Sequence, residues 1–146
     1  MKEALLISEC LLGVACRYDG ESRPLDAAAL DALREKYELV PVCPEQLGGL
    51  PTPRPSAERR DGGVCNVLGA DVTAQFCRGA EETCRLAALF GCKRALLKER
   101  SPSCGCGEIY DGSFTGTLRA GAGVTAEALK EAGVAVFGER GLEALL

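Results

Sequence analysis

Ala4-Leu5-Leu6-Ile7 leads directly into Ser8-Glu9-Cys10-Leu11-Leu12-Gly13, and the fold class can be worked out from this stretch. The first four residues are a short apolar run, which is typical of a buried strand. The polar residues, the cysteine and the glycine that follow indicate a loop. The stretch therefore predicts a buried strand that ends beside Cys10.

Three more apolar runs predict strands of the same kind, at residues 38–42, 95–97 and 134–137. The run at 38–42 ends at Cys43, although its Pro41 is unfavourable in a central strand because proline has no amide hydrogen to donate. The run at 95–97 is followed by a turn-forming segment that contains Cys104. Two further strands are thus expected to end close to a cysteine.

Segments with helical periodicity alternate with these strands. The first runs from Leu25 to Lys36, and Thr73 is expected to cap a second helix that continues to about residue 90. The apolar face of the second helix carries Phe76, Ala80, Cys84, Ala87 and Gly91. Thr125 is expected to cap a third helix that continues to Ala132, and a last short helix ends the chain.

Two long segments interrupt this alternation. The first, between Cys43 and Gly63, contains four prolines and is expected to be an ordered loop. A small hairpin of residues 64–67 and 71–72 follows it. The second begins after Cys104, is rich in glycine, and includes a short hairpin at about 109–117.

Apolar strands that alternate with amphipathic helices predict right-handed βαβ units around a parallel sheet. We therefore expect an α/β fold, a small three-layer Rossmann-like or flavodoxin-like domain with a mainly parallel four-stranded sheet and a small hairpin insertion. The chain has 146 residues, of which 47% are apolar, which is enough for one compact core. A single domain over residues 1–146 is expected.

Composition argues against several classes of protein. A net charge of -4 leaves no broad basic field for phosphates, so extended nucleic-acid binding is not expected. Neither a secretion signal nor a membrane-spanning apolar stretch is visible, and we expect a cytoplasmic protein. Nine cysteines, an odd number, do not favour a disulfide scaffold. The absence of histidine excludes Cys–His nucleophile pairs and histidine-containing zinc sites.

Cys10, Cys43 and Cys104 follow three different predicted strands. The carboxyl ends of parallel strands meet at one edge of the sheet, where ligands bind, so the three thiols are expected to converge there. Thiolates select iron–sulfur clusters, zinc or copper(I). No local C-x-x-C pair is present, and three dispersed ligands favour a catalytic centre with one open coordination position.

The same loops supply groups for acid–base chemistry. Glu45 is two residues after Cys43, and Ser101 and Ser103 precede Cys104. A carboxylate beside a metal centre can act as a general base. Hydroxyl groups can pass protons or donate to a developing anion.

The remaining candidates have simpler structural interpretations. Four cysteines are expected to serve in packing, and these are Cys65, Cys77, Cys84 and Cys92. Cys16 and Cys106 stay open as spare ligands, resolving thiols or residues without a role. Arg54, Arg59 and Arg60 are interpreted as a solvated basic turn, and Gly121-x-Gly123 as a loop hinge.

Several motifs, in this order, resemble those of the thiouracil desulfidase family over nearly the whole chain. They are Ser8-Glu9-Cys10-Leu11-Leu12-Gly13, Cys16-Arg17-Tyr18-Asp19-Gly20, Pro41-Val42-Cys43-Pro44-Glu45, Gly69-x-Asp71-Val72-Thr73, Ser101-Pro102-Ser103-Cys104-Gly105 and Ile109-Tyr110-Asp111-Gly112. The resemblance implies a [4Fe–4S] cluster held by Cys10, Cys43 and Cys104. It also implies that Glu45 activates water and that Ser101 relays a proton or steadies the intermediate.

The function implied by the resemblance is non-redox removal of sulfur from thiouracil, or from a related small thiolated compound, to give uracil and sulfide. A small thiolated pyrimidine is then the expected partner. Two other interpretations remain open at this point: a non-catalytic iron–sulfur or metal-binding protein that senses or carries its metal, and a thiol redox protein that uses Cys104 with Cys106 or Cys16.

Overall fold

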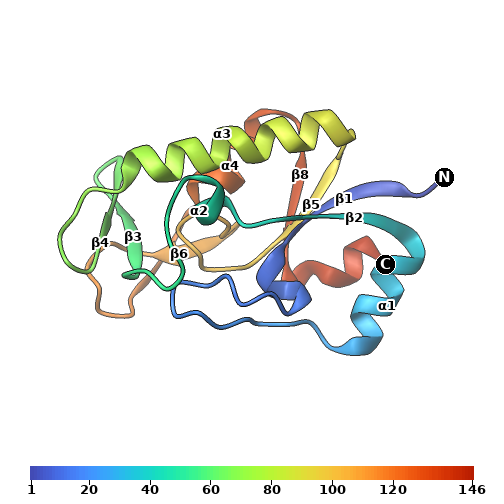
Figure 1. Cartoon of the computed structure of the whole chain (residues 1–146), viewed down its shortest axis with the longest axis horizontal. Helices are drawn as coiled ribbons and strands as arrows, with labels where there is room; N and C mark the ends of the chain where they lie inside the picture. Colours follow the sequence, from blue (N-terminus) through green and yellow to red (C-terminus); the bar gives the residue numbers. More distant parts are fainter.

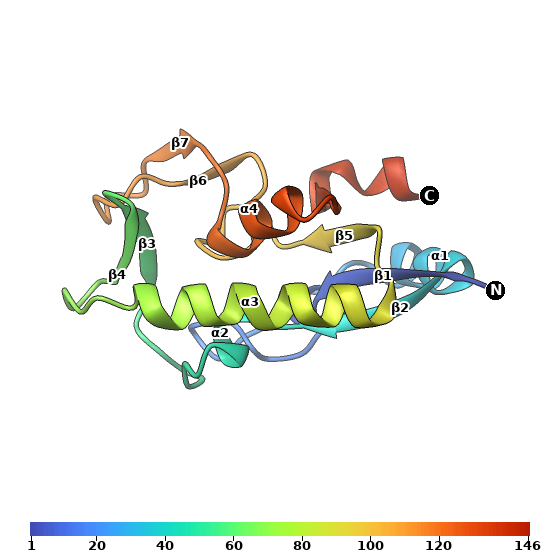
Figure 2. The ribbon, with the colours of Figure 1, turned by 90° about the horizontal axis from the view of Figure 1, so that it is seen from above.

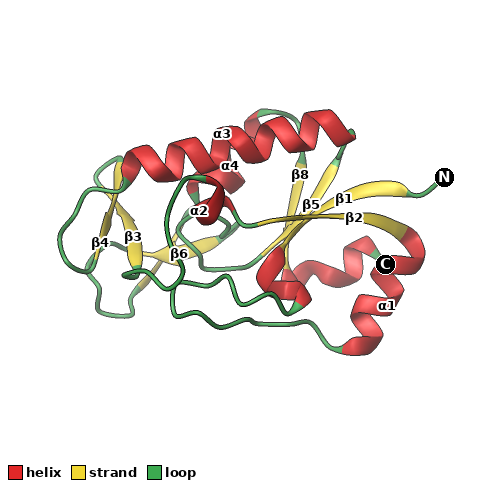
Figure 3. Ribbon diagram, in the orientation of Figure 1, coloured by secondary structure: helices red, strands yellow, loops and turns green.

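All four apolar runs form strands of one sheet in the computed structural model, which describes residues 1–146. The strands are β1 (Glu3–Ser8), β2 (Tyr37–Val42), β5 (Arg94–Leu97) and β8 (Ala135–Gly138). Their order is β2-β1-β5-β8, and every neighbouring pair is parallel. The predicted four-stranded parallel sheet is confirmed (Figure 3).

Helices cover both faces of this sheet (Figures 1 and 2). On one face lie α1 (Ala27–Lys36) and the 3-10 helix η2 (Glu139–Leu145). On the other face α3 (Thr73–Phe90) runs beside α4 (Val124–Glu131). These three layers confirm the predicted Rossmann-like α/β architecture. No helix combines the length and the apolar character that crossing a membrane requires.

The side chains of β1 alternate between the two layers of helices. Leu5 and Ile7 belong to a core with Leu33 of α1 and Leu145 of η2. Leu6 points the other way and belongs to a second core, with Leu129 of α4. A strand that is buried on both faces has no polar face, which explains why the sequence of β1 is a continuous apolar run.

Pro41 is accommodated because β2 is an edge strand. It stands opposite Ile7 in the parallel ladder, and β2 has no partner on its other side. An edge strand tolerates a residue without an amide hydrogen.

The predicted hairpin of residues 64–67 and 71–72 is present only as a single antiparallel bridge, and the preceding loop is not wholly irregular because it contains a strand. β3 (Ala57–Arg60) pairs with β4 (Gly63–Asn66), while Cys65 and Asp71 form only an isolated bridge. Asp61 and Gly62 join β3 to β4 with φ angles of 51° and 77°. An Asp-Gly pair is a strong signal for such a two-residue turn, and it was the clue in the sequence.

The expected helix caps are also wrong. Val72 caps α3 and Gly123 caps α4, neither through a side chain. The Thr73 hydroxyl instead accepts a hydrogen bond from the amide of Val64, and so ties β4 to the start of α3. The expected second hairpin is present as β6 (Glu108–Tyr110) and β7 (Leu118–Ala120).

A close contact between two glycines sets the position of the short helix α2 (Pro44–Leu47), which follows Cys43 directly. A Cβ atom on Gly79 of α3 would overlap the carbonyl group of Pro44, and one on Gly48 would overlap the carbonyl group of Gln75. The backbones of α2 and α3 therefore approach more closely than side chains would allow. This contact places the first turn of α2, with Glu45, at the edge of the sheet.

Gly79→Ala tests this contact. The contact predicts that the substitution destabilises the protein, whereas helix propensity predicts that it stabilises it. Alanine in a helix interior ordinarily stabilises by about 0.5–1 kcal/mol over glycine. Here we expect the free energy of unfolding, measured in urea on the metal-free protein, to fall by about 1–3 kcal/mol, since the new methyl group has no space. Arg78→Ala, on the exposed side of α3, is the control and should change stability by less than about 0.5 kcal/mol. A stabilised Gly79→Ala protein would contradict the contact.

Candidate active site

A cleft of about 560 Å³ opens at the carboxyl edge of the parallel sheet. Its lining comes from the segments that follow β1, β2 and β5, together with residues of β3 and of the β6–β7 hairpin. This is the place where the sequence predicted a ligand site. Segments that are distant in the chain meet here, because parallel strands all end on the same side.

Cys10, Cys43 and Cys104 all line this cleft, and each is at most 8% exposed. Cys10 lies in the 3-10 helix η1 (Glu9–Leu12) after β1, Cys43 lies between β2 and α2, and Cys104 lies in the loop after β5. No three His, Cys, Asp or Glu side chains converge closely enough to hold a single ion. Soft thiol donors that line one cleft are the kind of donor that iron–sulfur clusters take.

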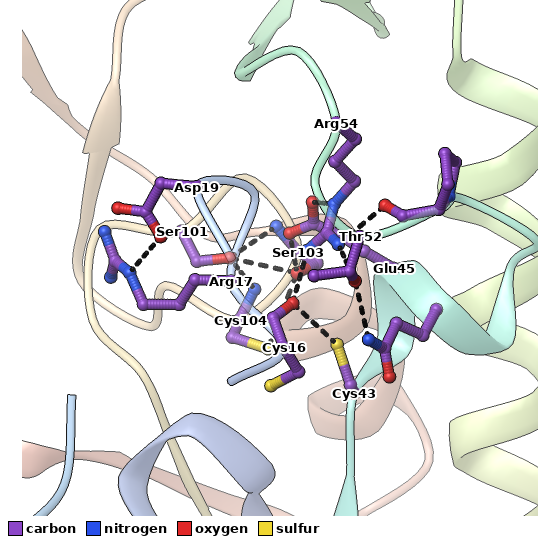
Figure 4. A network of polar contacts seen from close by, with 12 residues as sticks. Cys16, Arg17, Asp19, Cys43, Glu45, Thr52, Arg54, Ser101, Ser103 and Cys104 are labelled. Carbon is purple, nitrogen blue, oxygen red and sulfur yellow. Dashed lines mark hydrogen bonds and ion pairs between the residues drawn. The ribbon is translucent and has the colours of Figure 1, made fainter. Parts of the chain in front are cut away.

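Cys16 is a fourth buried thiol in the cleft, at 3% exposed. Its thiol shares hydrogen bonds with those of Cys10 and Cys43, and the bond with Cys10, followed by burial, raises the pKa of Cys16 to about 11. The Cys43 thiol also lies 3.7 Å from the Cys16 carbonyl oxygen, to which it donates (Figure 4). The sequence had left the role of Cys16 open, and the structure brings it against two of the predicted ligands.

The pKa values of two of the predicted ligand thiols, Cys43 and Cys104, are raised in the metal-free chain. The hydrogen bond with Cys16, together with burial, raises the pKa of Cys43. Burial raises the pKa of Cys104 to about 12. A thiol must lose its proton to bind a metal, so loading this site releases protons.

Glu45 ends a chain of hydrogen-bonded hydroxyl groups. Its Oε2 accepts a hydrogen bond of 3.0 Å from Ser103, and the Ser101 and Ser103 hydroxyl oxygens are 2.9 Å apart. Because the single hydroxyl hydrogen of Ser103 goes to Glu45, Ser101 must be the donor to Ser103. The result is an ordered chain from Ser101 through Ser103 to Glu45 (Figure 4).

Backbone amides hold the start of this chain in place. The Ser101 hydroxyl oxygen accepts from the amides of Ser103 and Cys104, at 3.2 and 3.1 Å. Ser103 itself is 2% exposed, and its hydroxyl lies 3.5 Å from the Cys104 sulfur. The structure therefore puts Ser103, rather than Ser101, in direct contact with Glu45.

Arg54 corrects an interpretation made from the sequence. It was expected in a solvated basic turn, but it is buried, at 8% exposed, and forms an ion pair with Glu45. Arg59 is also paired, with Glu127, and it does not line the cleft. The sequence carried no clear signal for Arg54, because nothing in the proline-rich segment reveals which side chain points inward.

The other cysteines lie outside the cleft lining. Cys92 is buried and Cys84 packs against the same core, as expected of packing residues. Cys77 was expected to pack as well, but it is exposed on the outer side of α3. Cys106 is half-buried and is not part of the cleft.

The first turn of α4 supports the loop that carries Ser103 and Cys104. The amides of Val124 and Thr125 donate to the carbonyl oxygens of Pro102 and Ser103, both at 2.9 Å. A Cβ atom on Gly123 would overlap the carbonyl group of Ser103. Gly123 is thus a packing contact at the start of a helix, which corrects its interpretation as a loop hinge.

Known proteins resemble the chain over nearly its whole length. Residues 5–141 match the profile of the 2-thiouracil desulfurase family. A Bacillus subtilis (strain 168) protein described as "Uncharacterized protein YbbK" is 40% identical over an alignment of 155 positions that covers 97% of this chain and 99% of that protein. The solved structure of the "[4Fe-4S]-dependent thiouracil desulfidase TudS (DUF523Vcz)" is 49% identical, with a TM-score of 0.94 over 99% of this chain and 95% of that one.

Gly123→Ala is expected to displace the loop that holds Cys104. The added methyl group pushes the Ser103 carbonyl away from α4, and the buried Cys104 thiol should then react faster with an alkylating reagent. The rate can be followed in the metal-free protein by mass spectrometry of the Cys104 peptide. Gly107→Ala is the control, because a Cβ atom at Gly107 meets nothing within 4 Å. Equal rates in the two variants would count against this role of Gly123.

Proposed function

The chain belongs to the 2-thiouracil desulfurase family, and on this basis we propose that it is a [4Fe–4S]-dependent desulfidase. It removes sulfur from thiouracil, or from a related small thiolated compound, to give uracil and sulfide. The observation that carries the proposal is one cleft in which buried thiols stand beside a hydrogen-bonded chain from Ser101 to Glu45. The family match confirms the resemblance that was found from the sequence motifs.

Cys10, Cys43 and Cys104 are the residues that we assign to hold the cluster. The assignment is supported by their burial, by their positions after three neighbouring parallel strands and by the preference of thiolates for iron–sulfur clusters. A bound [4Fe–4S] cluster with these three ligands would have one iron without a protein ligand, and it would supply a Lewis acid for the sulfur of the substrate.

The overall reaction is a hydrolysis and needs no electron donor. Water supplies the oxygen of the new carbonyl group, the carbon–sulfur bond breaks, and the two hydrogen atoms of water leave with sulfur as hydrogen sulfide. The chain must therefore accept a proton from water and return a proton to the departing sulfur. It has no histidine for either task, so carboxylate and hydroxyl groups remain.

Glu45 is the residue that we assign to take the proton from water. Each carboxylate oxygen has two lone pairs, so Oε2 can accept from water while it also accepts from Ser103. The Ser101 hydroxyl, at the other end of the chain, can turn to donate to a developing anion. Ser103 lies between the two and allows a proton to pass from one end to the other.

We also place the protein in the cytoplasm, with a small thiolated pyrimidine as its substrate. All nine cysteines are free, which is the state that a reducing compartment maintains. The mixed charge of the chain offers no broad basic field for a nucleic acid.

Sulfide release tests the proposed function. Protein reconstituted anaerobically with iron and sulfide, and then separated from excess sulfide, should convert 2- or 4-thiouracil to uracil with one sulfide released per uracil formed. Glu45→Gln should keep its iron and lose turnover, since an amide cannot take the proton. If fully loaded wild-type protein released no sulfide from any thiolated base, the proposal would be wrong, and a non-catalytic iron–sulfur protein would be the remaining interpretation. Turnover without iron would point to thiol chemistry instead.

Serine substitution tests the three ligands. Each of Cys10→Ser, Cys43→Ser and Cys104→Ser should lower the iron-to-protein ratio and the visible absorbance of the anaerobically reconstituted protein, because serine does not replace a soft thiolate. Cys77→Ser, at an exposed site, should load iron as the wild type does. A variant among the three that keeps the full cluster would remove that residue from the ligand set.

A further inference from the structure

Arg54 is the one residue with a formal charge among the buried residues of the chain. Burial of a charged side chain is costly unless the charge is paired and its donors are satisfied. The Arg54 side chain is 4% exposed and that of its partner Glu45 is 15% exposed, so water screens this pair far less than it screens a surface pair. The groups that accept hydrogen bonds from Arg54 indicate why a charged side chain is buried here.

The guanidinium group of Arg54 joins three segments of the cleft wall. Nε donates to Oε1 of Glu45 at 3.0 Å, and Nη2 donates to the carbonyl oxygen of Cys16, also at 3.0 Å. Nη1 donates to the carbonyl of Pro51 at 3.1 Å and to the hydroxyl of Thr52 at 3.0 Å (Figure 4). A rigid, planar fork of donors can make these contacts at once, whereas a lysine ammonium cannot.

We propose that Arg54 is a positioning residue of the desulfidase, which orients Glu45 for proton transfer and ties this orientation to the segment that carries Cys16. The inference rests on the proposed function. Because Arg54 occupies Oε1 of Glu45, the other oxygen, Oε2, is held toward Ser103 and the hydroxyl chain. The carboxylate of Glu45 therefore presents one defined oxygen, Oε2, to the hydroxyl chain.

The Cys16 carbonyl oxygen accepts from Arg54 at 3.0 Å and also lies 3.7 Å from the Cys43 sulfur. Arg54 therefore links Glu45 to a segment that contacts Cys43.

Arg54→Ala and Arg54→Lys test the proposal in the reconstituted enzyme. We expect both variants to load iron, with kcat for thiouracil lowered by about 100-fold, the typical cost of a misplaced catalytic group, while KM changes much less. Millimolar guanidinium ion should restore part of the kcat of Arg54→Ala, and it should not restore that of Glu45→Gln. Arg59→Ala is the matched control, because Arg59 contacts Ala122 and Glu127 and does not touch Glu45.

If Arg54→Ala does not fold, Arg54→Lys still tests whether the guanidinium group is needed for the wild-type kcat. A loaded Arg54→Lys enzyme with the kcat of the wild type would overturn the proposal, because the fork would then be dispensable. A folded, loaded Arg54→Ala enzyme whose lost kcat guanidinium ion does not restore would also overturn it.

A measurement without turnover separates this inference from the proposed function. In metal-free protein, Arg54→Ala and Glu45→Gln should each lower the stability to urea, and the double variant should lose less than the sum of the two, since neither partner is left alone. Additive losses would overturn the pairing of Arg54 with Glu45. A wild-type enzyme that is inactive on thiolated bases, with this coupling intact, would count against the proposed function alone.

Discussion

β1 pairs in parallel with β2 on one side and with β5 on the other, and the rest of the structure depends on this pairing. Parallel neighbours end at the same edge, so the residues after these three strands are neighbours in space. Cys10, Cys43 and Cys104 occupy those places. A ladder with antiparallel pairs would have sent at least one of the thiols to the opposite edge. The burial of β1 on both faces keeps its register, since a slip of one residue would exchange the side chains of the two cores.

Strand ends alone place the thiols near one another, but they do not place the groups that act with them. Close backbone contacts do this: Gly79 lets α2 approach α3 and so sets Glu45, and Gly123 lets the Cys104 loop rest on the start of α4. One contact positions the segment of Glu45 and the other the segment of Ser103, and these two side chains meet in a hydrogen bond. Glycine is required at both positions by space, and the conformational freedom of the residue is secondary.

Burial shapes the chemistry of the site before any metal is bound. Hydrogen bonding among the thiols raises the pKa of Cys16 and Cys43, and burial raises that of Cys104. In the metal-free cleft the thiols of Cys16, Cys43 and Cys104 therefore favour the neutral form, and the Glu45–Arg54 pair is a buried ion pair beside them. A thiol must lose its proton to bind a metal, so metal binding would change this balance. Backbone amides hold the Ser101 end of the hydroxyl chain, and two of the four hydrogen bonds of the Arg54 side chain go to backbone carbonyl groups.

Periodicity and strand ends, which are local properties, were enough to predict the four parallel strands, the helix of residues 73–90 and the meeting of Cys10, Cys43 and Cys104. The motifs around those residues also indicated the family. The pairing of β4 with β3 was not predicted. The predicted caps of α3 and α4, the predicted solvent exposure of Arg54 and the predicted burial of Cys77 were wrong. Each of these depends on contacts between segments distant in the chain. The burial of a strand or helix can be predicted from its sequence, because a whole face of the element is buried and its residues are therefore apolar at regular positions. The role of a single arginine, serine or glycine has no such sequence pattern, and it depends on which segments of the folded chain contact that residue.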